Sequence, residues 1–225
     1  MNRISKWLLA LGIFLATLSI LLYWAWTWAP SFYPPATRLL ANDPATRQLA
    51  KQTDQQALQF LDELRYEPTF TLRLTDRQVN AWLVGEVEPR HSGLWPPGVS
   101  QPRLQFQPDE CVLAARFQPA RGPQTVASAR LRLAVTADHR LGIELVRLQA
   151  GWFPLPPESL VEPLVEQLKR AGVPAEWRQI EGRDVLTIDP FDAPWVRERM
   201  ESGQPRLERI ALRDGELELT GRRAP

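Results

Sequence analysis

The chain has few of the residues from which disulfides and metal sites are built. It contains one cysteine and two histidines among 225 residues. One cysteine cannot form an intramolecular disulfide, so we expect packing to stabilise the fold and Cys111 to be a small buried hydrophobe. A structural metal site needs several ligands at close spacing, and His91, His139 and Cys111 are not spaced in that way. The sequence therefore predicts no metal and no cofactor.

Signatures of common enzyme classes and of nucleic-acid binding are also missing. There is no glycine-rich phosphate loop and no Gly-x-Ser-x-Gly nucleophile elbow. The 27 lysines and arginines are balanced by 26 aspartates and glutamates, which leaves a net charge of +1. Nucleic-acid-binding domains carry a clear excess of basic residues, so we predict no nucleic-acid partner.

Charge of either sign is absent from the stretch between Trp7 and Ala29. A helix of these 23 residues would be about 35 Å long, enough to cross a hydrocarbon layer of about 30 Å. Arg3 and Lys6 precede it, and the positive-inside rule then keeps the N-terminus in the cytoplasm. We predict a transmembrane signal anchor over residues 1–29. A cleaved signal peptide is the alternative, although its apolar core usually spans only about 7–15 residues.

The remainder predicts an interfacial linker and one extracytoplasmic domain. Residues 30–42 contain two adjacent prolines and indicate a stiff exit from the membrane. The domain covers 43–225 and begins with an amphipathic helix over 43–66, capped by aspartate and proline. A capping box at Thr75 to Gln78 starts a short helix that we expect to end near Gly85. Another helix is expected from Glu158 to Ala171.

Alternating apolar residues predict strands after residue 103. Residues 104–117 indicate a hairpin, and two long strands follow at 127–135 and 141–150, with a bulge near Val146. Asp214-Gly215 between alternating runs indicates a final hairpin. The fold class is therefore α+β, with a curved, mainly antiparallel sheet of roughly six to eight strands and about two packed helices.

The two long strands present one apolar face, and this face is the candidate ligand site. Its residues are small or aliphatic, namely Ala127, Ala129, Leu131, Leu133, Leu141, Ile143 and Leu145. If a helix fills this face, it is core; if not, it could take an acyl chain and gain about 0.8 kcal/mol per buried methylene. On the opposite face, Arg130, Arg132 and Arg147 form a basic stripe that suits either lipid phosphates or solubility.

Aromatic loops and one pair of carboxylates are the other candidate sites. Trp95 lies in a predicted long loop over 86–101, and Trp152 and Phe153 follow the second long strand, so these three are candidate partner contacts. Glu86 and Glu88 indicate a solvated part of the same loop. A pair of aspartates, Asp189 and Asp192, suits either acid-base chemistry or turn formation.

Two segments carry a resemblance to known proteins, LTDRQVNAWL from Leu74 to Leu83 and VRLQAGWFPLPPESL from Val146 to Leu160. With the N-terminal anchor and the long strands, their order resembles the YpmS-like family of uncharacterised membrane-anchored bacterial proteins. The layout is more remotely similar to tubular lipid-binding proteins, in which a long helix lies in a curved antiparallel sheet. The resemblance implies lipid binding or envelope-associated assembly, and it transfers no catalytic residues.

The leading functional prediction is a non-enzymatic protein of the bacterial inner membrane. Its membrane partner is reached through Trp7 to Ala29, and its extracytoplasmic domain binds lipid or another apolar ligand in the curved sheet. The alternative is an envelope assembly or interaction protein that docks a membrane-protein partner through its aromatic loops. A third hypothesis is an extracytoplasmic hydrolase centred on Asp189 and Asp192.

Overall fold

The fold is α+β with mainly antiparallel strands, as predicted, and the strands divide into two sheets. The computed structural model describes residues 3–37, 39–90, 95, 98–120, 122–156, 165–166, 168–170, 172–180, 182–192, 194–198 and 204–223. Three strands form one sheet in the order β1-β10-β9: β1 (Thr69–Thr75), β10 (Glu216–Arg223) and β9 (Pro205–Arg213). The other sheet has the order β2-β3-β4-β5-β8-β7, with β6 beside β5.

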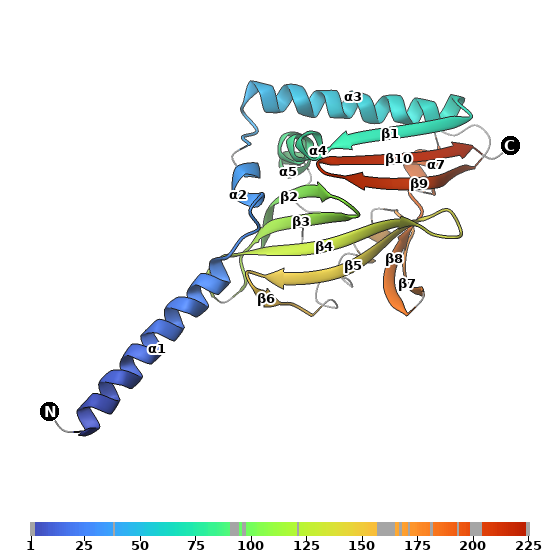
Figure 1. The fold of residues 1–225 in the computed structure, drawn as a ribbon. Coiled ribbons are helices and arrows are strands. Elements are labelled where there is room, and N and C mark those ends of the chain that lie inside the picture. The colour runs from blue at the N-terminus through green and yellow to red at the C-terminus, as the bar shows by residue number, and fades with distance from the viewer. Residues whose placement is uncertain are drawn as a thin grey trace.

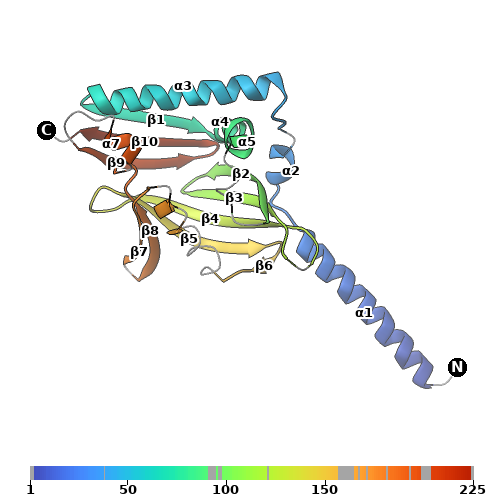
Figure 2. The same ribbon diagram turned by 180° about the vertical axis from the view of Figure 1, so that it is seen from behind.

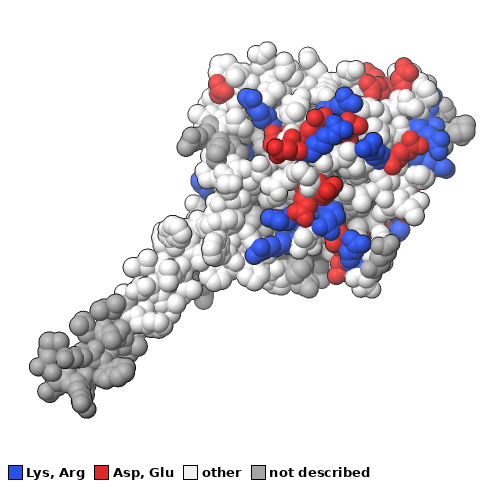
Figure 3. Space-filling model, in the orientation of Figure 1, with Lys and Arg blue, Asp and Glu red and all other residues white. Residues whose placement is uncertain are grey.

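Helix α1 (Arg3–Thr27) projects away from the rest of the molecule (Figures 1 and 2). Its side chains are described from Phe14 onward. The large apolar ones are exposed as far as Trp24, by 73% at that residue, and Trp26 is half-buried. No basic or acidic side chain lies on this described part (Figure 3). Among the residues that the structure describes, no helix reaches the length and mean hydropathy of a membrane span.

The predicted linker packs onto the domain. A short helix, α2 (Tyr33–Ala36), forms within it. The Tyr33 side chain is buried, and its hydroxyl donates a hydrogen bond to the carbonyl oxygen of Gln101 over 3.0 Å. The linker is thus held against β2 (Val99–Gln107), which contains Gln101.

The long helix α3 (Pro44–Tyr66) forms as the sequence predicts. Asp43 is its N-cap and accepts a hydrogen bond from the Thr46 backbone N–H over 3.1 Å. Its buried face includes Ala50 and Leu64, and the helix lies along β1 (Figure 1). The pattern of apolar residues therefore identified the helix but only part of its buried side, because Leu64 is buried as expected and Leu58 is 54% exposed.

The next helix starts as predicted but ends later. Thr75 caps α4 (Asp76–Trp82) in a reciprocal capping box with Gln78. The chain then continues through a π-helix (Leu83–Val87) into α5 (Glu88–Arg90), so the predicted helix end near Gly85 and the predicted start of the loop at residue 86 are wrong. Gly85 lies inside the helical run because it faces α3: a Cβ added there would lie 3.0 Å from the Cβ of Ala50.

The larger sheet contains the predicted hairpins and the predicted bulge. Its elements are β2, β3 (Glu110–Phe117), β4 (Thr125–Val135), β5 (Leu141–Ala150), β6 (Phe153–Pro154), β7 (Ala175–Ile180) and β8 (Arg183–Ile188). In the pairing of β4 with β5, Arg130 faces Arg147 and Leu131 faces Leu145, so Val146 is the extra residue. Both strands bend along their length (Figure 1).

The C-terminal hairpin does not join the larger sheet, which corrects the expectation of a single sheet. β9 and β10 turn at Asp214-Gly215 as predicted. β10 also pairs with β1 along the full length of β1, from Thr69 facing Arg222 to Thr75 facing Glu216. The two sheets meet through apolar side chains. Phe106 and Cys111 of the larger sheet pack with Leu212 of β9.

Two hydrophobic core clusters lie within the described part of the chain. The first contains Leu64, Phe70, Phe191 and Leu207 and joins α3 to the smaller sheet. The second, defined above by Phe106, Cys111 and Leu212, lies between the sheets. Cys111 is buried as expected, and burial raises the pKa of its thiol to about 12.

Most of the predicted helix from Glu158 to Ala171 lies outside the described residues; residues 165–166 and 168–170 within it are helical. A short helix, α7 (Pro194–Arg197), follows β8.

Candidate functional site

The end of α1 is built into the larger sheet. The carbonyl oxygen of Ala25 accepts a hydrogen bond from the Trp152 backbone N–H over 2.9 Å. The carbonyl oxygen of Trp26 accepts one from the Thr125 hydroxyl, and the Trp26 indole N–H donates to the carbonyl oxygen of Pro123 over 2.9 Å. Gly151, at φ 58°, lets the chain after β5 approach this helix end closely. We call these contacts the junction.

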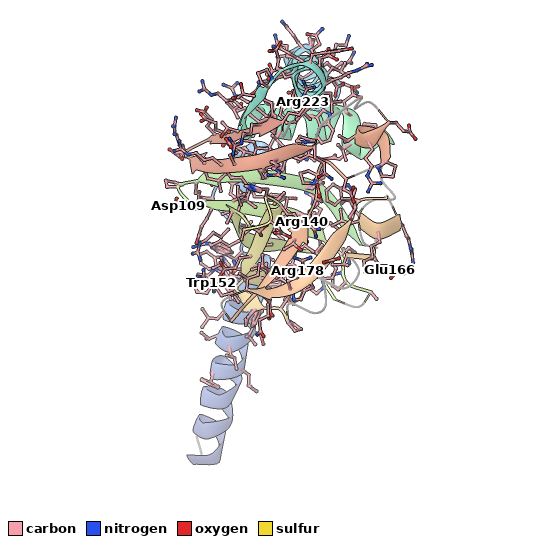
Figure 4. The ribbon with its side chains drawn as sticks, turned by 90° about the vertical axis from the view of Figure 1, so that its right-hand side faces the viewer. Asp109, Arg140, Trp152, Glu166, Arg178 and Arg223 are labelled. Atoms are coloured by element: carbon pink, nitrogen blue, oxygen red, sulfur yellow. The ribbon has the colours of Figure 1, made fainter. Side chains whose placement is uncertain are left out.

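Aromatic rings surround the junction. Trp26 packs against Phe153 with ring centroids 6.0 Å apart, and Trp28 meets the edge of Trp152 at 6.2 Å. Trp152 is 59% exposed and lies at the end of the domain from which α1 emerges (Figure 4). Two of the three predicted partner-contact residues, Trp152 and Phe153, are therefore brought together here. The third, Trp95, is half-buried in the connection between α5 and β2.

The seven residues of the predicted ligand face lie on one face of β4 and β5. Leu131 faces Leu145 and Leu133 faces Ile143, and all seven side chains are half-buried. Leu131 and Leu133 pack against the second core cluster, and Leu141 packs against the first. The other end of the face starts at the junction, because Ala127 pairs with Ala150. Part of the face is therefore core, and the part beside α1 stays a prediction of a ligand site.

The opposite face of the same strands contains a cavity of about 210 Å³, which we call the junction pocket. The chain directly after α1 forms one wall with Trp28 and Phe32. The strands form the other wall with polar side chains, including Arg130, Arg147 and Gln149. Two residues of the predicted basic stripe thus line a cavity next to the predicted membrane surface.

A buried polar cluster lies beneath α2. Arg103 is only 2% exposed and forms an ion pair with Glu88, while its Nη1 also donates to the carbonyl oxygen of Pro102 over 2.6 Å. Burial raises the pKa of Tyr33, and the positive charges of Arg116 and Arg103 oppose this rise. The expectation that Glu88 lies on a solvated loop was wrong, because the helix continues through it and the side chain reaches Arg103.

The candidate acid pair lies in a cleft of about 730 Å³ that is also lined by His139. Asp189 accepts hydrogen bonds from the backbone N–H groups of Phe191 and Asp192 over 3.1 and 3.2 Å. Asp192 forms an ion pair with Arg197. His139 Nδ1 lies 3.0 Å from the carbonyl oxygen of Leu207. Both carboxylates are thus engaged in a turn or an ion pair, which is the structural role that their sequence context favours.

Metal binding has no support in the described part of the chain, where no group of three or more histidine, cysteine or carboxylate side chains is placed to hold an ion. His91 lies outside the described residues. A comparison of the chain with protein-family models, with curated proteins and with solved structures finds no match.

Proposed function

We propose that this protein is a non-enzymatic, membrane-tethered domain outside the cytoplasmic membrane that binds lipid on the apolar face of β4 and β5. The tether is α1. Support comes from the uncharged run between Trp7 and Ala29 and from the two basic residues that precede it. The large apolar side chains of α1 from Phe14 to Trp24 are exposed, and an exposed apolar surface of this kind marks a binding or membrane site.

The junction is the observation that carries the proposal. Hydrogen bonds to the Ala25 and Trp26 carbonyl oxygens join the end of α1 to β4 and to the chain after β5. The apolar face therefore starts where the tether ends, with the small residues Ala127 and Ala129 nearest the junction. An acyl chain that leaves the bilayer beside α1 meets these two alanines first.

The energetics favour reversible binding. A methylene moved from water to an apolar site gains about 0.8 kcal/mol, but a methylene moved from the bilayer core gains almost nothing because both environments are apolar. The site therefore exchanges lipid with the adjacent membrane and does not store it. The tether keeps the site next to the bilayer, so the site does not need a high affinity for lipid.

Photo-cross-linking tests this function with the full chain in vesicles that contain a phospholipid with a diazirine on its acyl chain. We expect adducts on β4 and β5 as well as on α1. Ala129→Trp should fill the face and abolish the strand adducts, while adducts on α1 persist. Ala134→Trp is the matched control, because Ala134 is exposed on the other face of β4. Adducts confined to α1 in the unmodified protein would exclude the acyl-chain site, and absence of adducts on α1 would exclude the tether.

Partner docking is a second candidate because Trp152 is exposed beside the tether. Phe153 is less suited to this role, since it packs on Trp26. A benzoylphenylalanine placed at Trp152 distinguishes the two functions in native membranes. Adducts with lipid favour a side chain that lies in the membrane interface, and one discrete protein adduct, repeated between preparations, favours docking.

A further inference from the structure

We propose that the junction pocket binds the phosphate group of an anionic phospholipid headgroup. This inference rests on the proposed tether but not on the acyl-chain site, which lies on the opposite face of the sheet. The cavity of about 210 Å³ is smaller than the roughly 300–1,000 Å³ of pockets that enclose drug-sized ligands. It suits a small polar group and not a whole lipid.

The charges of the pocket are arranged for an anion. Arg130 and Arg147 face each other directly across β4 and β5, and like charges in that position repel. Within the described residues, Arg130 forms an ion pair only with Glu110, at 3.5 Å, and Glu110 also pairs with Arg132 at 3.2 Å. No carboxylate of the described chain forms an ion pair with Arg147. A phosphate between the two guanidinium groups removes the repulsion and offers each a charge-assisted hydrogen bond.

Neutral groups complete the pocket. The side chains of Gln105, Gln149 and Ser128 line it and provide amide and hydroxyl donors for phosphate or glycerol oxygens. Trp28 and Phe32 form the wall on the side of α1. Aromatic residues of this kind are enriched at the level of lipid headgroups, where one side of the ring meets hydrocarbon and the other meets water.

The position of the pocket favours a lipid over free phosphate. Its wall begins with Trp28, the residue after the last helical residue of α1, Thr27. Because the junction holds this helix end against the sheet, the pocket lies at the level where the tether leaves the bilayer. Basic side chains also gather over β4 and β5 on the side toward α1 (Figure 3). A headgroup in the adjacent leaflet can therefore reach the two arginines.

Calorimetric titration of the full chain in phospholipid-free detergent micelles tests the proposal. The probes are dihexanoylphosphatidylglycerol and inorganic phosphate. We expect the lipid to bind more tightly than phosphate, and Arg147→Gln to weaken lipid binding by about tenfold, as for loss of one hydrogen bond to a charged group. Arg147→Lys should recover part of the affinity. Arg183→Gln is the matched control, because Arg183 lies on the same face but pairs with Glu144 at 3.3 Å.

Each other outcome overturns the proposal. Equal weakening by Arg147→Gln and Arg183→Gln would show general charge attraction and no site. Equal affinity for the lipid and for inorganic phosphate would exclude a headgroup as the ligand, and no binding of either probe would exclude an anion site. Ala129→Trp should leave the titration unchanged, so loss of the acyl-chain site and loss of the headgroup site are separate results.

Discussion

We expect Gly151→Ala to open the junction between α1 and the sheet. Gly151 has φ 58°, in the left-handed region that side chains disfavour. A Cβ at this position would lie 2.4 Å from the carbonyl oxygen of Ala25 and 2.5 Å from that of Trp26. Both are backbone atoms that cannot rotate away, so the end of α1 and the chain after β5 have to move apart.

The expected magnitude has two parts. Alanine in the left-handed region costs about 1–2 kcal/mol relative to glycine. Displacement of α1 also breaks the hydrogen bonds that the Ala25 and Trp26 carbonyl oxygens accept from Trp152 and Thr125. Each contributes about 1 kcal/mol net, so the docking of α1 should weaken by about 2 kcal/mol beyond the backbone strain.

Hydrogen exchange of the full chain measures this effect at the Trp152 amide. A loss of about 2 kcal/mol corresponds to roughly 30-fold faster exchange through local opening. Gly182→Ala is the matched control, because Gly182 has φ 75° and an added Cβ would meet no atom within 4 Å. The control therefore carries the strain without the clash. Equal exchange rates of the Trp152 amide in the two variants would contradict the expected steric clash at residue 151. They would show that the junction is not a tight contact.

Two further predictions concern the interior. Glu88→Ala removes the carboxylate that pairs with the buried Arg103 and should lower the free energy of unfolding, measured in urea, by about 3 kcal/mol. Glu166→Ala is the control, because it breaks an exposed pair with Arg170 and should lower this free energy by less than about 0.5 kcal/mol. Equal losses in the two variants would contradict the argument that burial makes the Glu88 pair important. The pKa of Cys111 is about 12 when folded and 9.0 ordinarily, so the folded chain retains a proton that the unfolded chain releases. Stability that this thiol contributes below pH 9 should be lost as the pH rises from 9 to 12, and Cys111→Ala should flatten this part of the urea-midpoint profile.

Local signals predicted most of the individual elements. The N-cap at Asp43, the capping box at Thr75, the bulge at Val146 and the turn at Asp214-Gly215 each depend on a few adjacent residues, and all four are confirmed. The pairing of β1 with β10 was missed because its partners are about 145 residues apart and no local pattern joins them. The predicted helix end at Gly85 was wrong for a related reason. Glycine often marks helix ends, but at this position its lack of a side chain allows α3 to pack closely.

The candidate site shows the same division. Strand alternation predicted that Ala127, Ala129 and their neighbours share one face, and they do. It did not predict that Trp152 would meet Trp28, or that Arg130 would lie opposite Arg147 in a cavity, because both depend on where α1 ends and on the exact register. Glu88 was assigned to a solvated surface because residues 86–101 were predicted as a loop, and only the fold brings it to Arg103.

The junction also constrains the order in which the chain can mature. α1 precedes the domain in the chain, yet its hydrogen bonds to Pro123 and Thr125 span 97 and 99 residues. Contacts of such high sequence separation form only after the intervening loop has closed, and they are slow to form. Helix α1 can therefore form before the junction contacts fix the orientation of the domain relative to it. A fixed orientation of α1 therefore indicates that the domain has folded, since a chain whose β4 and β5 fail to pair lacks the junction contacts at the end of this helix.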